Sequence, residues 1–536
     1  MSVEVKIYDT TLRDGTQGES VSLSVDDKLA IARMLGDLGV HYVEGGWPGS
    51  NVKDAEFFRR AKSLNFGMAK LAAFGSTCHW RNSPETDPNL KALLDAETPV
   101  VTIFGKTWDL HVTKALGTTL DRNLELIEAS VDYLKRHGRE VVYDAEHFFD
   151  GFRANPDYSL KTLQAAERGG ADWLVLCDTN GGMLTRRLRE IVLTAKEAVG
   201  LSLGIHAHND SDLAVANSLA AVESGATQIQ GTINGYGERC GNANLCSLIP
   251  ILELKLGRAT IGQDALARLT MVSRCVSEIA NLPHRSDMPF VGTSAFAHKG
   301  GVHVSAVMRD PVTYEHVSPD LTGNSRRVLV SDLSGKSNIA YKAAEMGVDL
   351  TGSDDKLKQL VDSIKQMEHE GFQFEAADGS LRVMFEEALG RGHDTFSLER
   401  YSVVTERDSS GHVDARAEVT VVANGEVIRG RASGNGPVHA LDLGLRQALS
   451  GVFPHLDSVR LADYKVRILE SDRGTATRVR VLIETQDAES TWTTVGVSDN
   501  ILDASCNALV DAFKYKLLKS ADTAGSHYEV LHAGVV

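Results

Sequence analysis

The sequence lacks the features that would place the chain in a membrane or in a disulfide-bonded secreted class. It has no apolar run of roughly 18 residues, the length needed to span a bilayer, so we do not expect a membrane protein. Its six cysteines are scattered and form no C-x-x-C pair, which favours reduced thiols over a disulfide framework. The N-terminus shows no basic segment followed by an apolar core, so we predict no signal peptide and expect a cytoplasmic protein.

Positive charge is also scarce. The 56 lysines and arginines are outnumbered by 72 acidic residues, and the formal net charge is −16. This balance disfavours a nucleic-acid surface, because phosphate binding needs clustered lysine and arginine. It does not exclude a small anionic substrate, since one local arginine or metal ion can bind a carboxylate. With 536 residues the chain is too long for one ordinary domain, and we expect a large catalytic unit with an appended module.

In roughly the first half of the chain, short β-branched or apolar runs alternate with longer amphipathic stretches. This alternation is typical of repeated βα units around a parallel sheet. Eight such units predict a closed (β/α)8 TIM barrel over residues 1–265, with the active site at the C-terminal ends of the strands. The predicted strands centre on residues 5–12, 41–47, 69–75, 100–105, 140–146, 173–179, 203–209 and 228–234.

After the predicted barrel the pattern changes twice. Residues 266–392 read as helical stretches broken by loops, which we interpret as a linker and lid region. Residues 393–536 return to alternating strands and predict an α+β domain. Its strands are followed by a helical segment at 434–449, and a second set is followed by one at 498–513. This doubled module carries no cluster of catalytic residue types, which favours binding of an effector or a partner.

The strongest local signal for chemistry is His206-Ala207-His208 at the end of the seventh strand. Because side chains alternate along a strand, both imidazoles lie on one face and could chelate a metal. The alternative is a pair of hydrogen-bonded histidines. Asp14 and Asn242 follow the first and eighth strands and would add two oxygen ligands. Such a mixed set suits Mg²⁺, Mn²⁺ or Zn²⁺ with room for water or substrate.

Other polar residues at strand ends are candidates for binding the substrate. Arg13 could clamp a carboxylate or stabilise an alkoxide, or it could form a structural ion pair. Asp144, Glu146 and Thr179 end the fifth and sixth strands and could hydrogen-bond a substrate, or could orient other side chains. Glu44 on the second strand could bind substrate or act as the partner of Arg13.

Two residues outside the barrel are candidates for moving a proton. His303 and Tyr314 lie in the region that could fold over the barrel mouth as a lid. A histidine titrates near neutral pH and is a natural proton acceptor. The alternative is that each residue only packs or forms a hydrogen bond.

Five motifs spread over nearly the whole chain carry a resemblance to a known family. The chain resembles the acetyl-CoA-dependent 2-oxo acid condensing enzymes, which include isopropylmalate, homocitrate and citramalate synthases. The motifs are DTTLRDGTQGE (9–19), HAHND (206–210), NGYGERCGN (234–242), HKGGVH (298–303) and GNGPVHAL (434–441). The resemblance implies three groups of site residues. These are metal ligands at Asp14, His206, His208 and Asn242, contacts to the keto acid at Arg13, Glu146 and Thr179, and acetyl-CoA activation by His303 and Tyr314.

Within that family, EGGWPGSN (44–51) and the stretch 314–338 look most like the branch that uses pyruvate. This implies an acyltransferase of isoleucine biosynthesis that makes citramalate and CoA from acetyl-CoA, pyruvate and water by a metal-dependent Claisen-type condensation. It further implies a homodimer with isoleucine as effector of the C-terminal regulatory domain. The alternative within the family is a 2-isopropylmalate synthase, which takes 2-oxoisovalerate in leucine biosynthesis.

Three alternative functions outside the condensing enzymes fit the sequence less well. A 3-hydroxyacyl-CoA lyase would use the same metal ligands, but the long C-terminal module argues against it. A biotin-dependent carboxyltransferase needs a lysine on a barrel strand, whereas the sixth strand reads Leu176-Cys177-Asp178-Thr179. A non-catalytic amino-acid sensor is disfavoured because Arg13 and the proposed metal ligands are all present.

Overall fold

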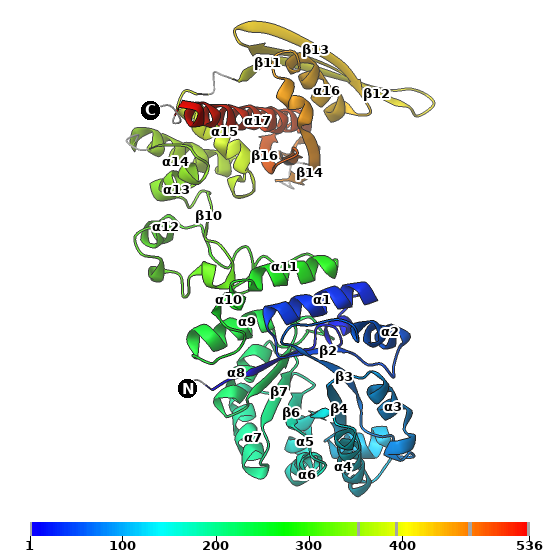
Figure 1. Cartoon of the computed structure of the whole chain (residues 1–536). Helices are drawn as coiled ribbons and strands as arrows, with labels where there is room; N and C mark the ends of the chain where they lie inside the picture. Colours follow the sequence, from blue (N-terminus) through cyan, green and yellow to red (C-terminus); the bar gives the residue numbers. More distant parts are fainter. Residues whose placement is uncertain (1–2, 351–353, 392–394, 470–473, 533–536) are drawn as a thin grey trace. The chain divides into compact units, whose positions relative to one another are not determined.

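The computed structural model of the chain describes residues 3–350, 354–391, 395–469 and 474–532 (Figure 1). The chain divides into two compact units, which are Met1–Phe296 with His316–Arg326, and Ala297–Glu315 with Arg327–Val536. The first unit therefore continues past residue 265, and the predicted boundary between residues 392 and 393 lies outside the described residues. Within the described ranges, no helix is long and apolar enough to cross a membrane.

The first unit is built on a closed barrel of eight parallel strands, as the alternating pattern predicted (Figure 1). The barrel closes where β1 pairs with β8, with Lys6 opposite Gln228. The strands are β1 (Lys6–Asp9), β2 (Tyr42–Gly46), β3 (Lys70–Ser76), β4 (Val100–Lys106), β5 (Glu140–Glu146), β6 (Trp173–Asp178), β7 (Leu203–Ala207) and β8 (Gln228–Gly231).

Helices between the strands surround the barrel and have the end signals that their sequences predict. At the start of α1, Ser24 and Asp27 form a capping box, and the helix ends at Gly39, whose φ of 92° is left-handed and suits glycine. The other helices of the βα units are α2 (Val52–Ala61), α3 (Pro88–Asp95), α4 (Leu120–Arg136), α5 (Phe148–Ala154), α6 (Pro156–Arg168), α7 (Thr185–Ala198) and α8 (Ala214–Glu223), while α1 spans Val25–Leu38. The unit continues with α9 (Leu245–Pro250), α10 (Gln263–Leu266) and α11 (Leu269–Ile279).

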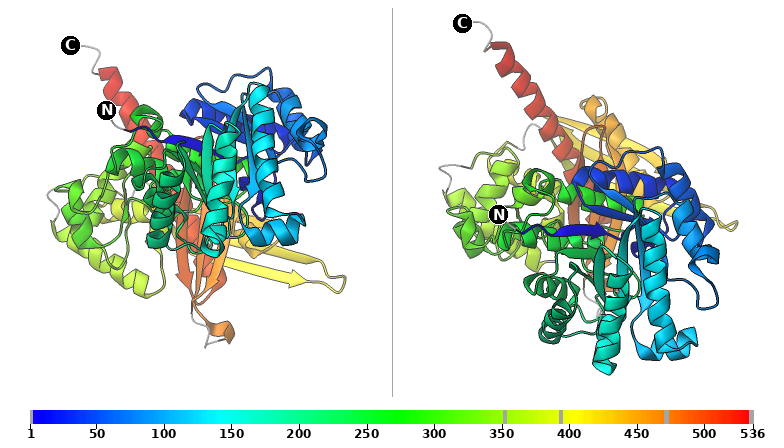
Figure 2. Two further views of the ribbon diagram at one scale, coloured as in Figure 1. Left: turned by 90° about the horizontal axis from the view of Figure 1, so that it is seen from below. Right: turned by 60° about the horizontal axis from the view of Figure 1, so that its bottom comes forward.

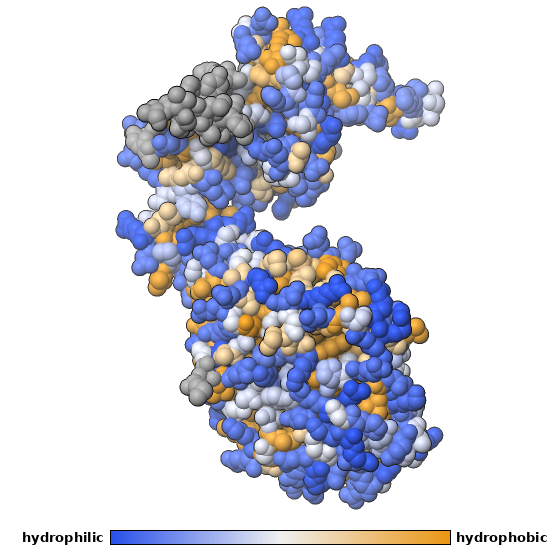
Figure 3. Space-filling model, in the orientation of Figure 1, coloured by the Kyte–Doolittle hydropathy of each residue, from blue (hydrophilic) through white to orange (hydrophobic). Residues whose placement is uncertain are grey.

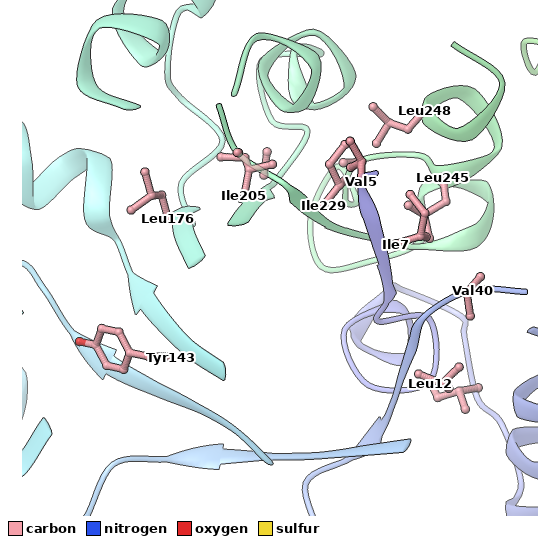
Figure 4. Close-up of a cluster of buried hydrophobic side chains, with 14 of the residues drawn as sticks. Val5, Ile7, Leu12, Val40, Tyr143, Leu176, Ile205, Ile229, Leu245 and Leu248 are labelled. Atoms are coloured by element: carbon pink, nitrogen blue, oxygen red, sulfur yellow. The ribbon is translucent and has the colours of Figure 1, made fainter. Parts of the chain in front are cut away.

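The barrel strands are buried on both faces, and this produces two hydrophobic clusters. Outward side chains such as Ile7 and Ile229 join Leu245 and Leu248 of α9 in the large cluster, part of which is drawn in Figure 4. The alternate residues, which include Tyr8, form a separate small cluster with residues of the same barrel strands. Because successive side chains point to opposite faces, this second cluster lies inside the barrel. The rigid barrel thus fixes the positions of the loops that follow its strands.

The second unit begins with short helices and a two-stranded pairing. These elements are β9 (Ala297–His298), α12 (Gly301–Val307), β10 (Arg327–Val328), α13 (Lys336–Glu345), α14 (Asp354–His369) and α15 (Asp378–Ala388). Of these elements, α13, α14 and α15 share a hydrophobic cluster built around Ile339, Leu360, Ile364 and the intervening Phe374. The helical stretches predicted within 266–392 are confirmed, and α14 is the longest of these helices.

The rest of the second unit is doubled, as predicted. One antiparallel sheet has the order β11-β12-β13 and is followed by α16, and the other has the order β14-β15-β16 and is followed by α17. The helix α17 is much longer than the predicted segment and continues beyond its sheet (Figure 2). The face of each unit that Figure 3 shows is mainly hydrophilic, with scattered apolar areas. The elements are β11 (Phe396–Arg407), β12 (Val413–Ala423), β13 (Glu426–Gly434), α16 (Pro437–Leu449), β14 (Arg460–Ile468), β15 (Val479–Gln486), β16 (Thr491–Ser498) and α17 (Ile501–His532).

Candidate active site

A cavity of about 220 Å³ lies at the C-terminal ends of the barrel strands. This is where the active site of a TIM barrel is expected. The cavity gathers most of the candidate residues, although they lie far apart in the sequence. It is lined by Arg13, Asp14, Gln17, Trp47, Phe74, Phe104, Asp144, Glu146, Cys177, Thr179, His206, His208 and Glu238.

Three of the four predicted metal ligands form a compact buried group. Ligand atoms of Asp14, His206 and His208 all lie within 4.8 Å of one another. His206 Nε2 is 3.2 Å from Asp14 Oδ2, and His208 Nε2 is 4.0 Å from the same oxygen. The three residues are between 1% and 6% exposed. Their donor atoms are two imidazole nitrogens and a carboxylate, which suit a divalent cation such as Mg²⁺, Mn²⁺ or Zn²⁺.

Unpartnered buried atoms support the fit of a cation to this group. Asp14 Oδ1, His208 Nδ1 and Asn242 Oδ1 are buried and have no hydrogen-bond partner among the described residues. A buried polar atom without a partner is costly, so such atoms usually meet a water or an ion. Asn242 also forms a backbone bridge with His208, and its side-chain nitrogen donates to the Tyr236 carbonyl at 3.2 Å. Asn242 does not line this cavity, and its predicted role as a fourth ligand stays a prediction.

The charges at this group favour the metal-binding forms of Asp14 and His208. Burial alone would raise the pKa of Asp14, but Arg13 and the hydrogen bond from His206 outweigh it and hold that pKa well below its usual range. Burial and repulsion from His206 lower the pKa of His208 to about 3. Asp14 is therefore ionised and His208 neutral at physiological pH, as metal binding requires. Burial alone would lower the pKa of His206, but the hydrogen bond to Asp14 outweighs it and raises that pKa, so a cation would displace the proton on Nε2.

A hydrogen-bonded relay behind His206 was missed by the sequence analysis. His206 Nδ1 is 2.9 Å from Gln230 Oε1, and Gln230 Nε2 donates to Asp144 Oδ1 at 2.9 Å. Because the Gln230 oxygen can only accept, Nδ1 carries the proton and Nε2 is left to bind a cation. Burial and the nearby Glu44 raise the pKa of Asp144 to about 7. The Q-x-Q alternation in β8 was the signal that could have revealed Gln230.

Arg13 lies beside the metal group, and 12% of its side chain is exposed. Its Nε donates to Glu44 Oε1 at 2.6 Å, its Nη1 is 3.3 Å from Asp14 Oδ2, and its guanidinium lies 3.8 Å from the ring centre of Phe74. Glu44 is fully buried, also accepts from Tyr8 at 2.7 Å, and is not among the residues that line the cavity. The structure thus places Glu44 as the partner that orients Arg13, the alternative raised from the sequence.

Glu146 and Thr179 both line the cavity, and each already has protein partners. Glu146 forms an ion pair with Lys106 at the end of β4. The Thr179 hydroxyl accepts a hydrogen bond from the His147 backbone N–H at 2.9 Å, and the Thr179 carbonyl accepts one from Arg239 at 2.6 Å. The sequence analysis gave no role to Lys106, His147 or Arg239, because their partners end or follow other strands of the barrel.

Three aromatic side chains form an apolar wall of the cavity. The rings of Trp47 and Phe74 are 5.8 Å apart edge to face, those of Trp47 and Phe104 are 5.6 Å apart, and Phe74 stacks on Phe104 at 5.5 Å. Such contacts hold the rings in fixed positions. The wall therefore limits the size of any group that lies against it.

His303 and Tyr314 belong to the second unit and lie next to each other there. Their rings stack with a centroid distance of 4.2 Å and an angle of 28°. Tyr314 is 46% exposed. Their predicted part in acetyl-CoA activation stays a prediction.

Comparison with known proteins shows to which family the chain belongs. The chain matches the HMGL-like family over residues 4–276. It is 53% identical to an (R)-citramalate synthase of Geobacter sulfurreducens over 97% of this chain and 99% of the relative. An (R)-citramalate synthase of Aquifex aeolicus is 52% identical over 97% of this chain and 99% of its own length. The chain belongs to the (R)-citramalate synthase family.

The family assignment extends beyond the barrel. Residues 290–371 match the homocitrate synthase post-HMGL domain-like family, and residues 375–517 match the LeuA allosteric (dimerisation) domain. A 2-isopropylmalate synthase of Methanocaldococcus jannaschii is 30% identical over 96% of this chain and 95% of its own length. The (R)-citramalate synthases named above are therefore markedly more similar to the chain than this isopropylmalate synthase is.

Proposed function

We propose that the chain is a citramalate synthase that condenses acetyl-CoA with pyruvate and water to give (R)-citramalate and CoA. The observation that carries the proposal is the cavity at the barrel mouth, in which Asp14, His206 and His208 converge beside the guanidinium of Arg13. This arrangement suits a small 2-oxo acid, whose carboxylate and keto oxygen need positive charge nearby. The names of the two (R)-citramalate synthases described above agree with it.

Asp14, His206, His208 and Asn242 would hold a divalent cation, which would supply electrophilic activation of the keto group. We propose Mg²⁺ or Mn²⁺, with Zn²⁺ as the alternative, because the set contains both imidazole and oxygen donors. Gln230 holds a proton on Nδ1 of His206, so that Nε2, which faces Asp14, is the nitrogen that would be offered to the cation.

The remaining polar groups of the cavity bind and orient the keto acid. Arg13 has guanidinium N–H groups beyond those used by Glu44, and they would bind the carboxylate and then the alkoxide that forms. The Thr179 hydroxyl accepts from His147, which leaves its hydrogen to be donated to a substrate oxygen. Lys106 holds the carboxylate of Glu146 in place at the cavity wall.

The aromatic wall accounts for a preference for pyruvate. A methyl group fits against Trp47, Phe74 and Phe104 in a cavity of about 220 Å³. The isopropyl group of 2-oxoisovalerate has two more carbons, and packed rings yield to extra volume only at a cost. The same side chains exclude water from the reacting carbons.

The carbon–carbon bond forms in two steps. A general base, for which His303 and Tyr314 are the predicted candidates, takes a proton from the acetyl methyl group of acetyl-CoA, and the enolate carbon attacks the keto carbon of pyruvate. The electrons of the carbonyl bond move onto its oxygen, where Arg13 faces the new charge before a proton is added. Water then cleaves the thioester, which releases CoA and makes the overall reaction irreversible.

The second unit supplies the assembly and regulation in this proposal. Its match to the LeuA allosteric (dimerisation) domain indicates a dimer and an effector site. We propose a homodimer inhibited by isoleucine, since the product leads toward that amino acid. A cytoplasmic location fits the six free cysteines and the two metabolic substrates.

The test follows the release of free thiol from acetyl-CoA with each keto acid. The wild-type chain should turn over pyruvate at least about tenfold better than 2-oxoisovalerate, because forcing extra carbons against packed side chains costs about 1–3 kcal/mol. Asp14→Ala and His206→Ala should abolish turnover, while Asp95→Ala, which breaks an exposed pair with Lys91 at 2.9 Å, should not. Undiminished turnover in the first two variants would refute the metal site, and a preference for 2-oxoisovalerate would refute the substrate.

A further inference from the structure

Thr179 is held at both of its polar groups by residues with unusual backbone conformations. His147 donates its backbone N–H to the Thr179 hydroxyl, and Arg239 donates Nη2 to the Thr179 carbonyl. Both residues have left-handed backbones, with φ of 55° for His147 and 58° for Arg239. Such a conformation costs a non-glycine residue free energy, and it persists where the surroundings require it.

Arg239 also ties together the loops that follow three consecutive strands. Arg239 lies in the loop after β8. Its Nε and Nη2 donate to the two carboxylate oxygens of Asp210, in the loop after β7, at 2.7 and 3.0 Å. Its Nη2 also donates to the carbonyl of Thr179, in the loop after β6. The planar guanidinium can make these three bonds at once because its N–H groups point in fixed directions. One side chain therefore sets the spacing of loops that carry Thr179, His208 and Asn242.

Stability does not account for this arrangement. The Arg239 side chain is 38% exposed, and exposed ion pairs contribute little to folding free energy. A clamp of this kind instead contributes by fixing geometry, because a small misplacement of a binding group lowers catalytic efficiency strongly.

We propose that Arg239 is a positioning residue that fixes Thr179 for binding of the keto acid. The proposal rests on the function proposed above, in which the Thr179 hydroxyl donates to pyruvate. With its carbonyl held by Arg239 and one hydroxyl lone pair used by His147, Thr179 keeps its hydroxyl hydrogen for a donor bond, and its side chain lines the cavity.

The test compares Arg239→Gln, Thr179→Val and the double variant in steady-state assays with pyruvate and acetyl-CoA varied separately. Arg239→Gln should raise the KM for pyruvate about tenfold and leave the KM for acetyl-CoA and the thermal midpoint nearly unchanged. The double variant should be no worse than Thr179→Val alone, because two residues that act through one contact are not additive. Arg168→Gln breaks an exposed pair with Glu128 at 2.8 Å on the outer helices and should match the wild type.

The outcomes separate this inference from the proposed function. Wild-type kinetics in Arg239→Gln would overturn the inference, as would losses that multiply in the double variant or a KM rise shared equally by both substrates. A Thr179→Val variant without effect would also overturn it, since there would be no contact to position. A wild-type chain that releases no thiol with pyruvate would refute the proposed function itself.

Discussion

Replacement of Gln230 by leucine should weaken metal binding without unfolding the barrel. Gln230 is fully buried, accepts from His206 Nδ1 at 2.9 Å and donates to Asp144 at the same distance. Without this acceptor, His206 gains by moving its proton to Nε2, which then donates to Asp14 and competes with the cation. Loss of a buried partner of this kind costs about 1–3 kcal/mol. Outer-shell partners of metal-binding histidines typically contribute 10–100-fold in affinity, or about 1.4–2.7 kcal/mol.

The same strand provides a matched control. Gln228 is two residues away, on the same face of β8, and is fully buried, but its amide atoms have no hydrogen-bond partner among the described residues. Gln228→Leu should therefore leave metal affinity unchanged and be neutral or stabilising for the fold. Both variants remove an amide of the same size at nearly the same depth, so a difference between them isolates the bond to His206.

The assay titrates Mn²⁺ into chelator-treated protein. Calorimetry measures the dissociation constant of Mn²⁺, and the recovery of thiol release measures the activity that the metal restores. Gln230→Leu should show a dissociation constant about 10–100-fold above that of Gln228→Leu. Dissociation constants within about twofold of each other would refute the reasoning, because the relay would then have no influence on the donor atom of His206.

Three further results are expected. Phe104→Ala should raise the ratio of kcat/KM for 2-oxoisovalerate to that for pyruvate about tenfold, since two added carbons gain about 0.8 kcal/mol each; an unchanged ratio would contradict the role of the wall. Burial raises the pKa of Asp511 to about 7, so this carboxyl stays protonated in the folded chain while the unfolded chain ionises near pH 4. The free energy of unfolding of the wild type should therefore fall from about pH 4 to 7. Asp511→Asn should have the same free energy of unfolding as the wild type at pH 4 and a value about 2–4 kcal/mol higher at pH 8, measured by denaturant unfolding. A difference that does not change with pH would refute the role of Asp511. Isoleucine, and not leucine, should lower thiol release by the full-length chain, and the reverse selectivity would refute the assigned effector.

The sequence was sufficient for the barrel because its signals are local. Each strand is a short apolar run, and residues such as Ser24 and Gly39 mark helix ends through contacts only a few positions away. His206 and His208 were identified for the same reason, since alternation along one strand is enough to place both on one face. The position of Asp14 near these histidines could be predicted as well, because closure of the barrel brings the end of the first strand close to the end of the seventh.

Contacts between neighbouring strands could not be predicted in the same way. The pairing of Lys106 with Glu146 and the bond of Gln230 to Asp144 depend on the register and closure of the sheet, and several inward polar side chains compete as partners. Glu44 illustrates the difficulty, because its residue type suits either substrate or Arg13, and only the three-dimensional position decides. The extra length of α17 was also missed, since periodicity alone does not mark its end.

The charges of the cavity explain why an acidic protein can bind an anion there. Its wall contains four carboxylates, those of Asp14, Asp144, Glu146 and Glu238, against one permanent cation, Arg13. Part of this excess is removed within the protein, because Lys106 pairs with Glu146 and the pKa of Asp144 rises to about 7. The negative charge that remains in the cavity still disfavours binding of the pyruvate anion, since like charges repel strongly in a cavity shielded from water. A divalent cation at Asp14 and the two histidines would reverse the sign of the local field, so substrate binding and metal binding should be coupled in this site.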